Sequence, residues 1–407
     1  MKQDAVTWLD FRADDLAQAK DFIRQMQEEG VIDELGFLAL QGRFSDLLHP
    51  ATTTLLRASR YLYFIPAIYR QLEREEVRSN QIRTFAQQRQ DQLATVLAVN
   101  EKVGVIGKES GLKLAQFPSL LYWSSLRKLG MFTSLISERG YQDQFDDIRR
   151  ERRGYADDDK TPQGSEGLQF WDDLPPVTFF NSQGQAKSGT SFKLTRLEAQ
   201  DLFDRFNTRF KDSLLSHMLN KKLTGIEWPW DVPKPSAELA VWLWHGKNLS
   251  LFVRGATLQY HAMVVDELVR RKIRTGGDSL LPQFTEWWAE AHGSLKKWKT
   301  DEFVTVSTVA SAMRLGAKGD RWFIDGWLAR CLAASSAEAL WNDPKARELV
   351  REREFRIKPA KARLRHLKHL KQWRPERVGS SMFQFNYRHL IGDRFVSEIL
   401  ASLDGAQ

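Results

Sequence analysis

The sequence predicts a mainly α-helical, multi-helical protein with few short strands. Apolar residues recur at three- and four-residue spacing along most of the 407 residues, and Gly or Pro marks the breaks between these patterns. Short apolar pieces separated by glycines occur in residues 168–191, where we expect a small hairpin. Hydrophobic residues make up 42% of the chain, which is enough to build sizeable cores.

Helical patterns fill most of the first 150 residues. A helix is expected over residues 14–29, where Gly30 ends it. A longer pattern follows a run of three threonines and continues through Glu75, and Pro66 is expected to kink it. A polar helix is then expected over residues 83–99.

A charged segment with almost no aliphatic residues separates the two halves of the chain. It reads RRERRGYADDDKTPQGSEG, covers residues 149–167 and ends in turn-forming residues. We therefore predict an N-terminal helical domain over residues 1–150, a mobile loop or linker over 151–167, and a C-terminal, mainly helical domain over 168–407. In the last of these, helices are expected over 197–207, over 211–219 and from about Ala237 onward.

Positive charge is concentrated near the carboxyl terminus. The chain has 60 Lys and Arg against 52 Asp and Glu, a formal net charge of +8. Residues 356–377 alone hold nine basic residues and one acid, so the remaining residues sum to about zero. The nine are Arg356, Lys358, Lys361, Arg363, Arg365, Lys368, Lys371, Arg374 and Arg377. Concentrated cations favour binding to a polyanion, because each neutralised phosphate releases counterions.

This basic segment has the pattern of an amphipathic helix. Pro359 can open a helix that runs toward Trp373, and leucines three residues apart would form its buried side. Lys361, Arg365 and Lys368 would form a cationic stripe that lies along a phosphate backbone. Two alternatives stay open: contact with an acidic protein partner, and a plain solvated surface.

A second candidate interface lies in the first half, over residues 107–132. The segment GKESGLKLAQFPSLLYWSSLRKLGMF resembles the helix-turn-helix of winged-helix domains, with a short helix near 112–116 and a second that ends at Gly130. In the second helix an apolar stripe faces inward, and Ser119, Arg127 and Lys128, together with Trp123 and Ser124, are expected to face outward toward nucleic acid. Ordinary packing of two helices with a short turn would give the same pattern.

The sequence offers no recognised catalytic motif. A P-loop and the zinc-protease motif H-E-x-x-H do not occur, and Cys331 is the only cysteine, which argues against disulfides and thiolate zinc sites and favours a reducing cytoplasm. We expect no cofactor and no metal. No uncharged run is longer than that of residues 114–126, which is too short to cross a bilayer, so no membrane contact is expected.

Blocks along the chain resemble one bacterial family. They are WLDFRADDLAQAKDFI, VIDELGF, ASRYLYFIPAIY, the segment from VIGKESG to LRKLGMF, LFVRGATLQYHAMV, KARLRHLKHLKQW and NYRHLIGDRFVSEIL. Together they span residues 8–400, and the sequence is similar to domain-of-unknown-function family six-three-six-one. The resemblance implies one shared architecture. It also implies a place in bacterial defence gene clusters beside helicases, phospholipase-D-like nucleases or methyltransferases, which would supply a protein partner.

Together these observations predict a cytoplasmic, non-catalytic subunit of an antiphage defence complex that binds nucleic acid, DNA rather than RNA, and assembles with an enzyme. One alternative is a metal-dependent nuclease or other hydrolase whose carboxylates meet only in the fold, for example those of Asp10, Asp14 and Asp15. The second alternative is a scaffold that binds only protein.

Overall fold

The computed structural model describes residues 34–108, 117–157, 169–176, 179–181, 183–274, 279–305, 320–373 and 384–405. Over these residues the fold is mainly α-helical, which confirms the predicted fold class. The chain forms two compact units, one of residues 1–43 and 244–385 and the other of residues 44–243 and 386–407. The helix expected over 14–29 lies outside the described residues.

The two units differ in charge, and we name them accordingly. The first unit carries 31 Lys and Arg against 24 Asp and Glu and is called the cationic unit. The second unit carries 29 against 28 and is called the neutral unit. The chain passes between them three times, within α2 (Leu38–Leu48), within α10 (Ala237–Arg270) and before α18 (His389–Asp404). Of the loop expected over residues 151–167, residues 151–157 continue a helix of the neutral unit and 158–167 lie outside the described residues.

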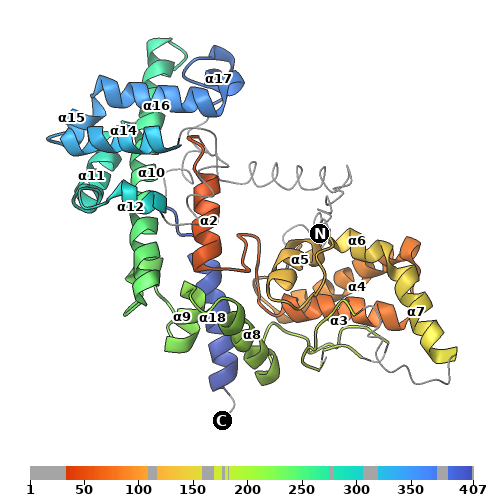
Figure 1. The fold of residues 1–407 in the computed structure, drawn as a ribbon. Helices are drawn as coiled ribbons and strands as arrows, with labels where there is room; N and C mark the ends of the chain where they lie inside the picture. Colours follow the sequence, from red (N-terminus) through yellow and green to blue (C-terminus); the bar gives the residue numbers. More distant parts are fainter. Residues whose placement is uncertain are drawn as a thin grey trace, which may run out of the picture. The chain divides into compact units, whose positions relative to one another are not determined.

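The neutral unit is an assembly of helices closed by the last described helix. α18 packs against α8 and α9 (Figure 1), and its Phe395, Val396 and Ile399 are buried. α3 packs against α4 and α5 in the same unit. The elements are α3 (Tyr61–Arg74), α4 (Ser79–Asn100), α5 (Pro118–Lys128), α6 (Glu138–Asp143), α7 (Phe145–Asp157), α8 (Arg196–Arg209), α9 (Leu214–Lys221) and the short η1 (Pro229–Asp231).

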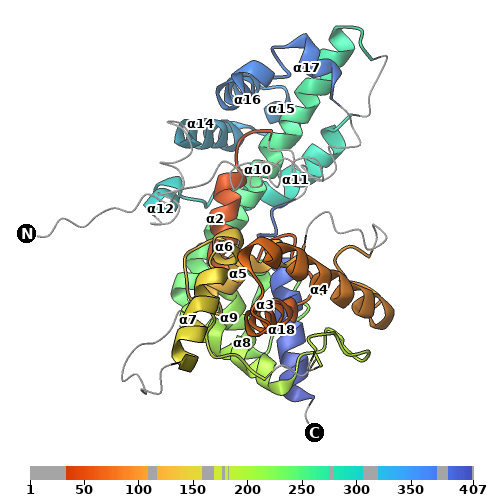
Figure 2. The same cartoon turned by 90° about the vertical axis from the view of Figure 1, so that its right-hand side faces the viewer.

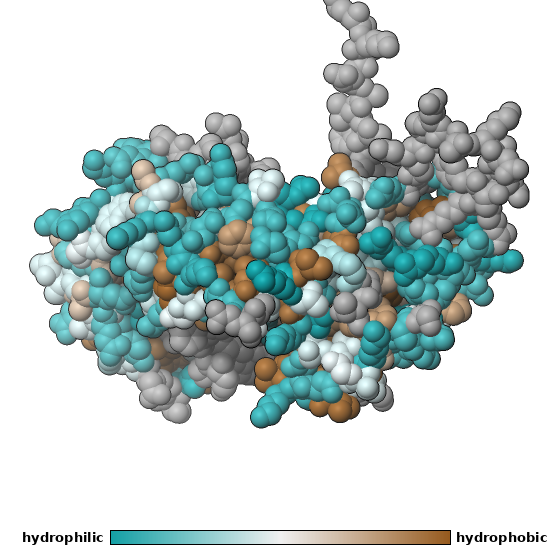
Figure 3. All heavy atoms as spheres, turned by 90° about the horizontal axis from the view of Figure 1, so that it is seen from below, coloured by the Kyte–Doolittle hydropathy of each residue, from teal (hydrophilic) through white to brown (hydrophobic). Residues whose placement is uncertain are grey.

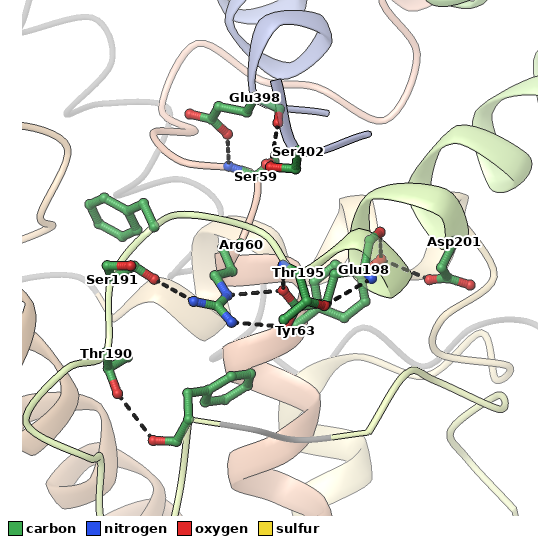
Figure 4. A network of polar contacts seen from close by, with 12 residues as sticks. Ser59, Arg60, Tyr63, Thr190, Ser191, Thr195, Glu198, Asp201, Glu398 and Ser402 are labelled. Carbon is green, nitrogen blue, oxygen red and sulfur yellow. Dashed lines mark hydrogen bonds and ion pairs between the residues drawn. The ribbon is translucent and has the colours of Figure 1, made fainter. Parts of the chain in front are cut away.

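A buried ion pair joins α3 to α8 inside the neutral unit. Thr195 and Glu198 form a capping box at the start of α8, in which each side chain accepts the other residue's backbone N–H. The Glu198 carboxylate also accepts a hydrogen bond from Arg60 Nε at 3.0 Å, and both side chains are almost completely buried (Figure 4). Arg60 donates further to the Ser191 carbonyl, so this guanidinium fixes the loop before α8 as well.

The cationic unit is arranged around the long helix α10. α14 packs against α16, and α11 packs against both α14 and α15. Gly255 of α10 allows Trp287 of α11 to approach closely, because a Cβ there would lie 2.0 Å from the Trp287 Cζ2. The elements are α11 (Leu281–Leu295), α12 (Thr300–Thr305), α14 (Asp320–Ala333), α15 (Ala337–Trp341), α16 (Pro344–Ile357), η2 (Pro359–Lys361) and α17 (Leu367–Lys371).

Several predicted elements are found close to their expected positions. The polar helix predicted over 83–99 is α4, and those predicted over 197–207 and 211–219 are α8 and α9. The helix that contains Pro66 begins only at Tyr61, because turns follow the three threonines. The expected hairpin is present as a single antiparallel bridge between Phe180 and Ala186.

The described helices show no membrane-spanning character, since none combines the length and the apolar composition needed to cross a bilayer. On the face drawn in Figure 3, hydrophobic residues are interspersed among hydrophilic ones. Exposed apolar side chains such as Val99, Val103 and Leu135 belong to different elements or loops. Scattered exposure of this kind is normal for a globular surface.

Candidate nucleic-acid interface

The prediction of one amphipathic helix from Pro359 to Trp373 is wrong. α16 ends at Ile357, and η2, a turn and the five-residue α17 follow it. The physical reason is Glu354, a completely buried carboxylate that accepts backbone N–H groups from Arg363 at 2.8 Å and Leu364 at 3.0 Å. These hydrogen bonds hold the chain in a turn, and Pro359 has no N–H with which to extend α16.

Four of the nine predicted phosphate-binding cations have carboxylate partners in the chain itself. Arg356 and Arg365 both pair with Glu352. Lys358 and Arg363 both pair with Glu34, whose side chain is 1% exposed. Burial opposes ionisation of Glu34, but Lys358 and Arg363 outweigh it and hold the pKa of this carboxyl below its ordinary value. Lys358 and Arg363 therefore belong to a buried ion-pair cluster of the cationic unit, whereas Arg356 and Arg365 are neutralised in partly exposed pairs.

The remaining predicted cations differ in their surroundings. Lys361 and Lys368 are exposed and have no carboxylate partner among the described residues. Lys371 is exposed as well, and Arg374 and Arg377 lie outside the described residues. The candidate interface thus keeps only part of the positive charge that the sequence concentrates in this segment.

Sequence analysis missed a second basic run that the fold places at the same end of the cationic unit. Residues 270–274 read RRKIR, at the end of α10, and the Arg274 guanidinium lies 5.9 Å from the centre of the Trp373 ring, just after α17. Figures 1 and 2 both show α16, α17 and this end of α10 together. The run was readable as a cluster of cations, but its proximity to residues 356–373 depends on tertiary contacts.

Four exposed cations define what we call the basic surface. None of them has a carboxylate partner within the described part of the chain. Two follow α10 and two lie in η2 and α17. They are Lys272, Arg274, Lys361 and Lys368. Cations that no internal carboxylate neutralises are the ones available to phosphate groups.

The second candidate interface, the helix-turn-helix, is not confirmed. Its second helix exists as α5, and Tyr122, Leu126 and Leu129 are buried as predicted. However, the outward orientation predicted for Ser119 and Trp123 is wrong, because these side chains are 2% and 5% exposed. The first helix of the motif was expected near residues 112–116, which lie outside the described residues.

A second layer of aromatic residues explains this burial. The Trp123 ring lies 4.6 Å from the ring of Phe132, and its Nε1–H donates to the Ile136 carbonyl. The backbone N–H of Ser119 donates to the Gln90 side chain at 2.8 Å. The sides of α5 that carry Ser119 and Trp123 are therefore covered, while Leu120, Ser124 and Lys128, at four-residue spacing, form its exposed stripe. Arg127 is partly buried, and Lys128 is exposed but pairs with Asp46 at 3.2 Å.

The described residues contain no group of three His, Cys, Asp or Glu side chains placed to hold a metal ion. The acids Asp10, Asp14 and Asp15 lie outside the described residues. Cys331 is buried, and burial raises the pKa of its thiol to about 12, which makes it a poor nucleophile. Nothing in the described part of the chain therefore supports the nuclease alternative.

Comparison with known proteins gives the family. The chain matches, over residues 3–403, the model of a family described as a family of unknown function (DUF6361), and it belongs to that family. This confirms the predicted resemblance over nearly the whole chain. No curated protein and no solved structure matches the chain.

Proposed function

We propose that this protein is a non-catalytic subunit that binds nucleic acid through the basic surface of its cationic unit. One observation carries the proposal: two basic segments, remote in sequence, converge at one end of this unit, where four exposed cations have no carboxylate partner among the described residues. The neutral unit balances its charges almost evenly, so attraction for a polyanion is concentrated in the cationic unit.

The expected salt dependence of DNA affinity follows from the number of cations in the basic surface. If each residue of the basic surface neutralises one phosphate of duplex DNA, log affinity falls with log salt at a slope of about −3 to −4. We therefore expect binding of the full chain to duplex DNA of about 20 base pairs to weaken on the order of 100-fold between 50 and 200 mM salt. Fluorescence anisotropy at several salt concentrations measures this slope.

A matched pair of variants tests whether nucleic acid binds at the basic surface. Neutralising the basic surface with Lys272→Gln, Arg274→Gln, Lys361→Gln and Lys368→Gln should remove most of the affinity and flatten the salt dependence. The control removes four exposed cations of the neutral unit through Lys193→Gln, Arg196→Gln, Lys211→Gln and Lys221→Gln. Equal losses in the two variants, or a flat salt response of the wild type, would overturn the proposal.

Two further arms address the class of partner. RNA of the same length and sequence tests the preference for DNA. From the family resemblance we also propose that the chain acts in a bacterial defence complex. Purification of the native complex tests whether a helicase, nuclease or methyltransferase accompanies it. A stable complex with protein, combined with no retention of nucleic acid at physiological salt, would favour the protein-only scaffold instead.

A further inference from the structure

The cationic unit contains a pocket of about 500 Å³ beside the basic surface. Four arginines line it. Arg270 is the last residue of α10 and Arg271 follows it, and Arg347 and Arg351 come from successive turns of α16. Arg270 and Arg271 immediately precede Lys272 and are close in sequence to Arg274. A chain of phosphates on the basic surface could therefore extend into this pocket.

The lining carries more positive than negative charge. Its two carboxylates are Asp266, which pairs with Arg347, and Glu267, which pairs with Arg270 and Arg271. Hydrogen bonds from Arg270 and Arg271 lower the pKa of Glu267 to about 2, so the carboxylate stays ionised at neutral pH. Arg351 also pairs with Glu348, which lies outside the lining, so four guanidinium groups against three carboxylates leave one positive charge for a ligand to balance.

Two of these arginines have N–H groups that donate to no residue in the described part of the chain. A guanidinium has five N–H groups, yet the ion pair of Arg271 uses only its Nε and that of Arg351 uses only its Nη1. The other nitrogens of these two groups have no hydrogen-bond partner among the described residues. The carboxylates thus hold the arginines in place, while planar pairs of N–H groups remain for an incoming anion.

The ligand that fits this chemistry is a phosphate monoester. It carries close to two negative charges at neutral pH and three acceptor oxygens, so it offers the arginine forks more charge and more acceptors than a phosphodiester does. Met263 and Leu364 add an apolar wall against which a sugar or base can pack. A phosphodiester inside a strand has one charge and two free oxygens, so the arginines would bind a terminal phosphate more strongly than an internal one.

We infer that this pocket binds a terminal phosphate monoester, either of a strand held on the basic surface or of a free nucleotide. The strand-end form rests on the proposed function, whereas the nucleotide form does not. The two sources share the same phosphate chemistry and differ in what competes for the pocket.

The test compares single strands of identical sequence with a phosphate or a hydroxyl at the 5′ end, and likewise at the 3′ end. The wild-type chain should bind one phosphorylated end roughly tenfold more tightly, the ratio expected when one charge-assisted hydrogen-bonding group is gained. Arg347→Gln with Arg351→Gln should bring the ratio to one. The control, Lys345→Gln with Arg356→Gln, removes the same charge from α16 outside the pocket and should leave the ratio unchanged.

The remaining outcomes separate the inference from the proposed function. Displacement of the phosphorylated strand by a nucleoside monophosphate supports the pocket and identifies free nucleotides as ligands. Binding of a nucleotide without binding of any strand supports the pocket and overturns the proposed function. Equal affinity for the strands with a phosphate or a hydroxyl at either end, with no nucleotide binding, overturns the inference about the pocket. The proposed function would then still stand. If the glutamine variant proves unstable, Arg351→Lys takes its place in the test. This change keeps the positive charge but removes the planar pair of N–H groups, so it should still lower the preference for the phosphorylated end.

Discussion

The two units handle charge in different ways. In the neutral unit, 29 basic residues meet 28 acidic ones, and the Arg60–Glu198 pair shows how such charges are used inside the fold. In the cationic unit, Glu34 and Glu352 neutralise four cations of the basic segment, but the basic surface is left without carboxylate partners in the described residues. The difference indicates that net charge alone does not locate a binding surface. What matters is which cations remain after internal pairing.

The largest expected effect tests internal pairing in the neutral unit. Glu198→Ala leaves Arg60 buried without its partner, and we expect the free energy of unfolding to fall by about 3–5 kcal/mol. Asp404→Asn removes an exposed partner of Lys222 and should cost less than about 1 kcal/mol. Urea denaturation measures both values. Similar small losses in the two variants would mean that the neutral unit does not depend on its buried pair.

The next effect concerns a buried histidine of the cationic unit. Burial lowers the pKa of His261 from an ordinary value of 6.5 to about 4. The unfolded chain therefore binds a proton more readily between these values, and stability present above pH 6.5 is lost as the pH falls toward 4, by up to about 3 kcal/mol. His261→Gln should remove this part of the pH dependence. Parallel stability profiles of wild type and variant over this range would contradict the expectation.

A matched pair of glycines compares packing in the two units. A Cβ on Gly255 would lie 2.0 Å from Trp287, and one on Gly392 would lie 2.0 Å from the ring of His49. Replacing either by alanine should cost about 1–3 kcal/mol through displacement of the ring. Gly293→Ala meets no atom within 4 Å and should instead stabilise α11 by about 0.5–1 kcal/mol. Thermal unfolding of the three variants gives the order, and a stabilising Gly255→Ala would refute this account of α10 and α11.

The smallest expected effect on stability concerns Glu352, which neutralises two cations of the candidate interface. Glu352→Gln releases Arg356 and Arg365, and because both pairs are partly exposed it should cost no more than about 1 kcal/mol. The freed cations should make DNA binding tighter and increase its salt slope by about one unit per additional phosphate contacted. Salt titration by anisotropy measures the change. Unchanged affinity would show that these arginines do not face the bound strand.

The sequence was sufficient for much of the local structure but not for the candidate interface. The periodicity of α4, α8 and α9 and the inward stripe of α5 follow from local patterns that the structure confirms. The apparent helix from Pro359 to Trp373 failed because the buried carboxylate of Glu354 overrides local propensity. The pairing of Lys358 with Glu34 joins residues 324 positions apart, and no periodicity reveals such a contact.

The candidate helix-turn-helix also shows that local patterns do not reveal contacts between separate elements. Polar or amphipathic residues at Ser119 and Trp123 suggested an exposed helix face, yet the structure buries both. The hydroxyl and indole groups of such residues can be satisfied by hydrogen bonds inside a protein, so polarity is weak evidence for exposure. Their burial requires partners such as Gln90 and Phe132, which lie on other elements and cannot be assigned from spacing alone.

The position of α18 has a consequence for biosynthesis. α8 and α9 leave the ribosome well before the intervening residues 244–385 are made, and only afterwards does α18 arrive to cover them. Until then the surfaces that will receive Phe395, Val396 and Ile399 stay uncovered and open to chaperones and proteases. A chain that stops before α18 would therefore expose apolar surface on α8 and α9 and would be prone to aggregation.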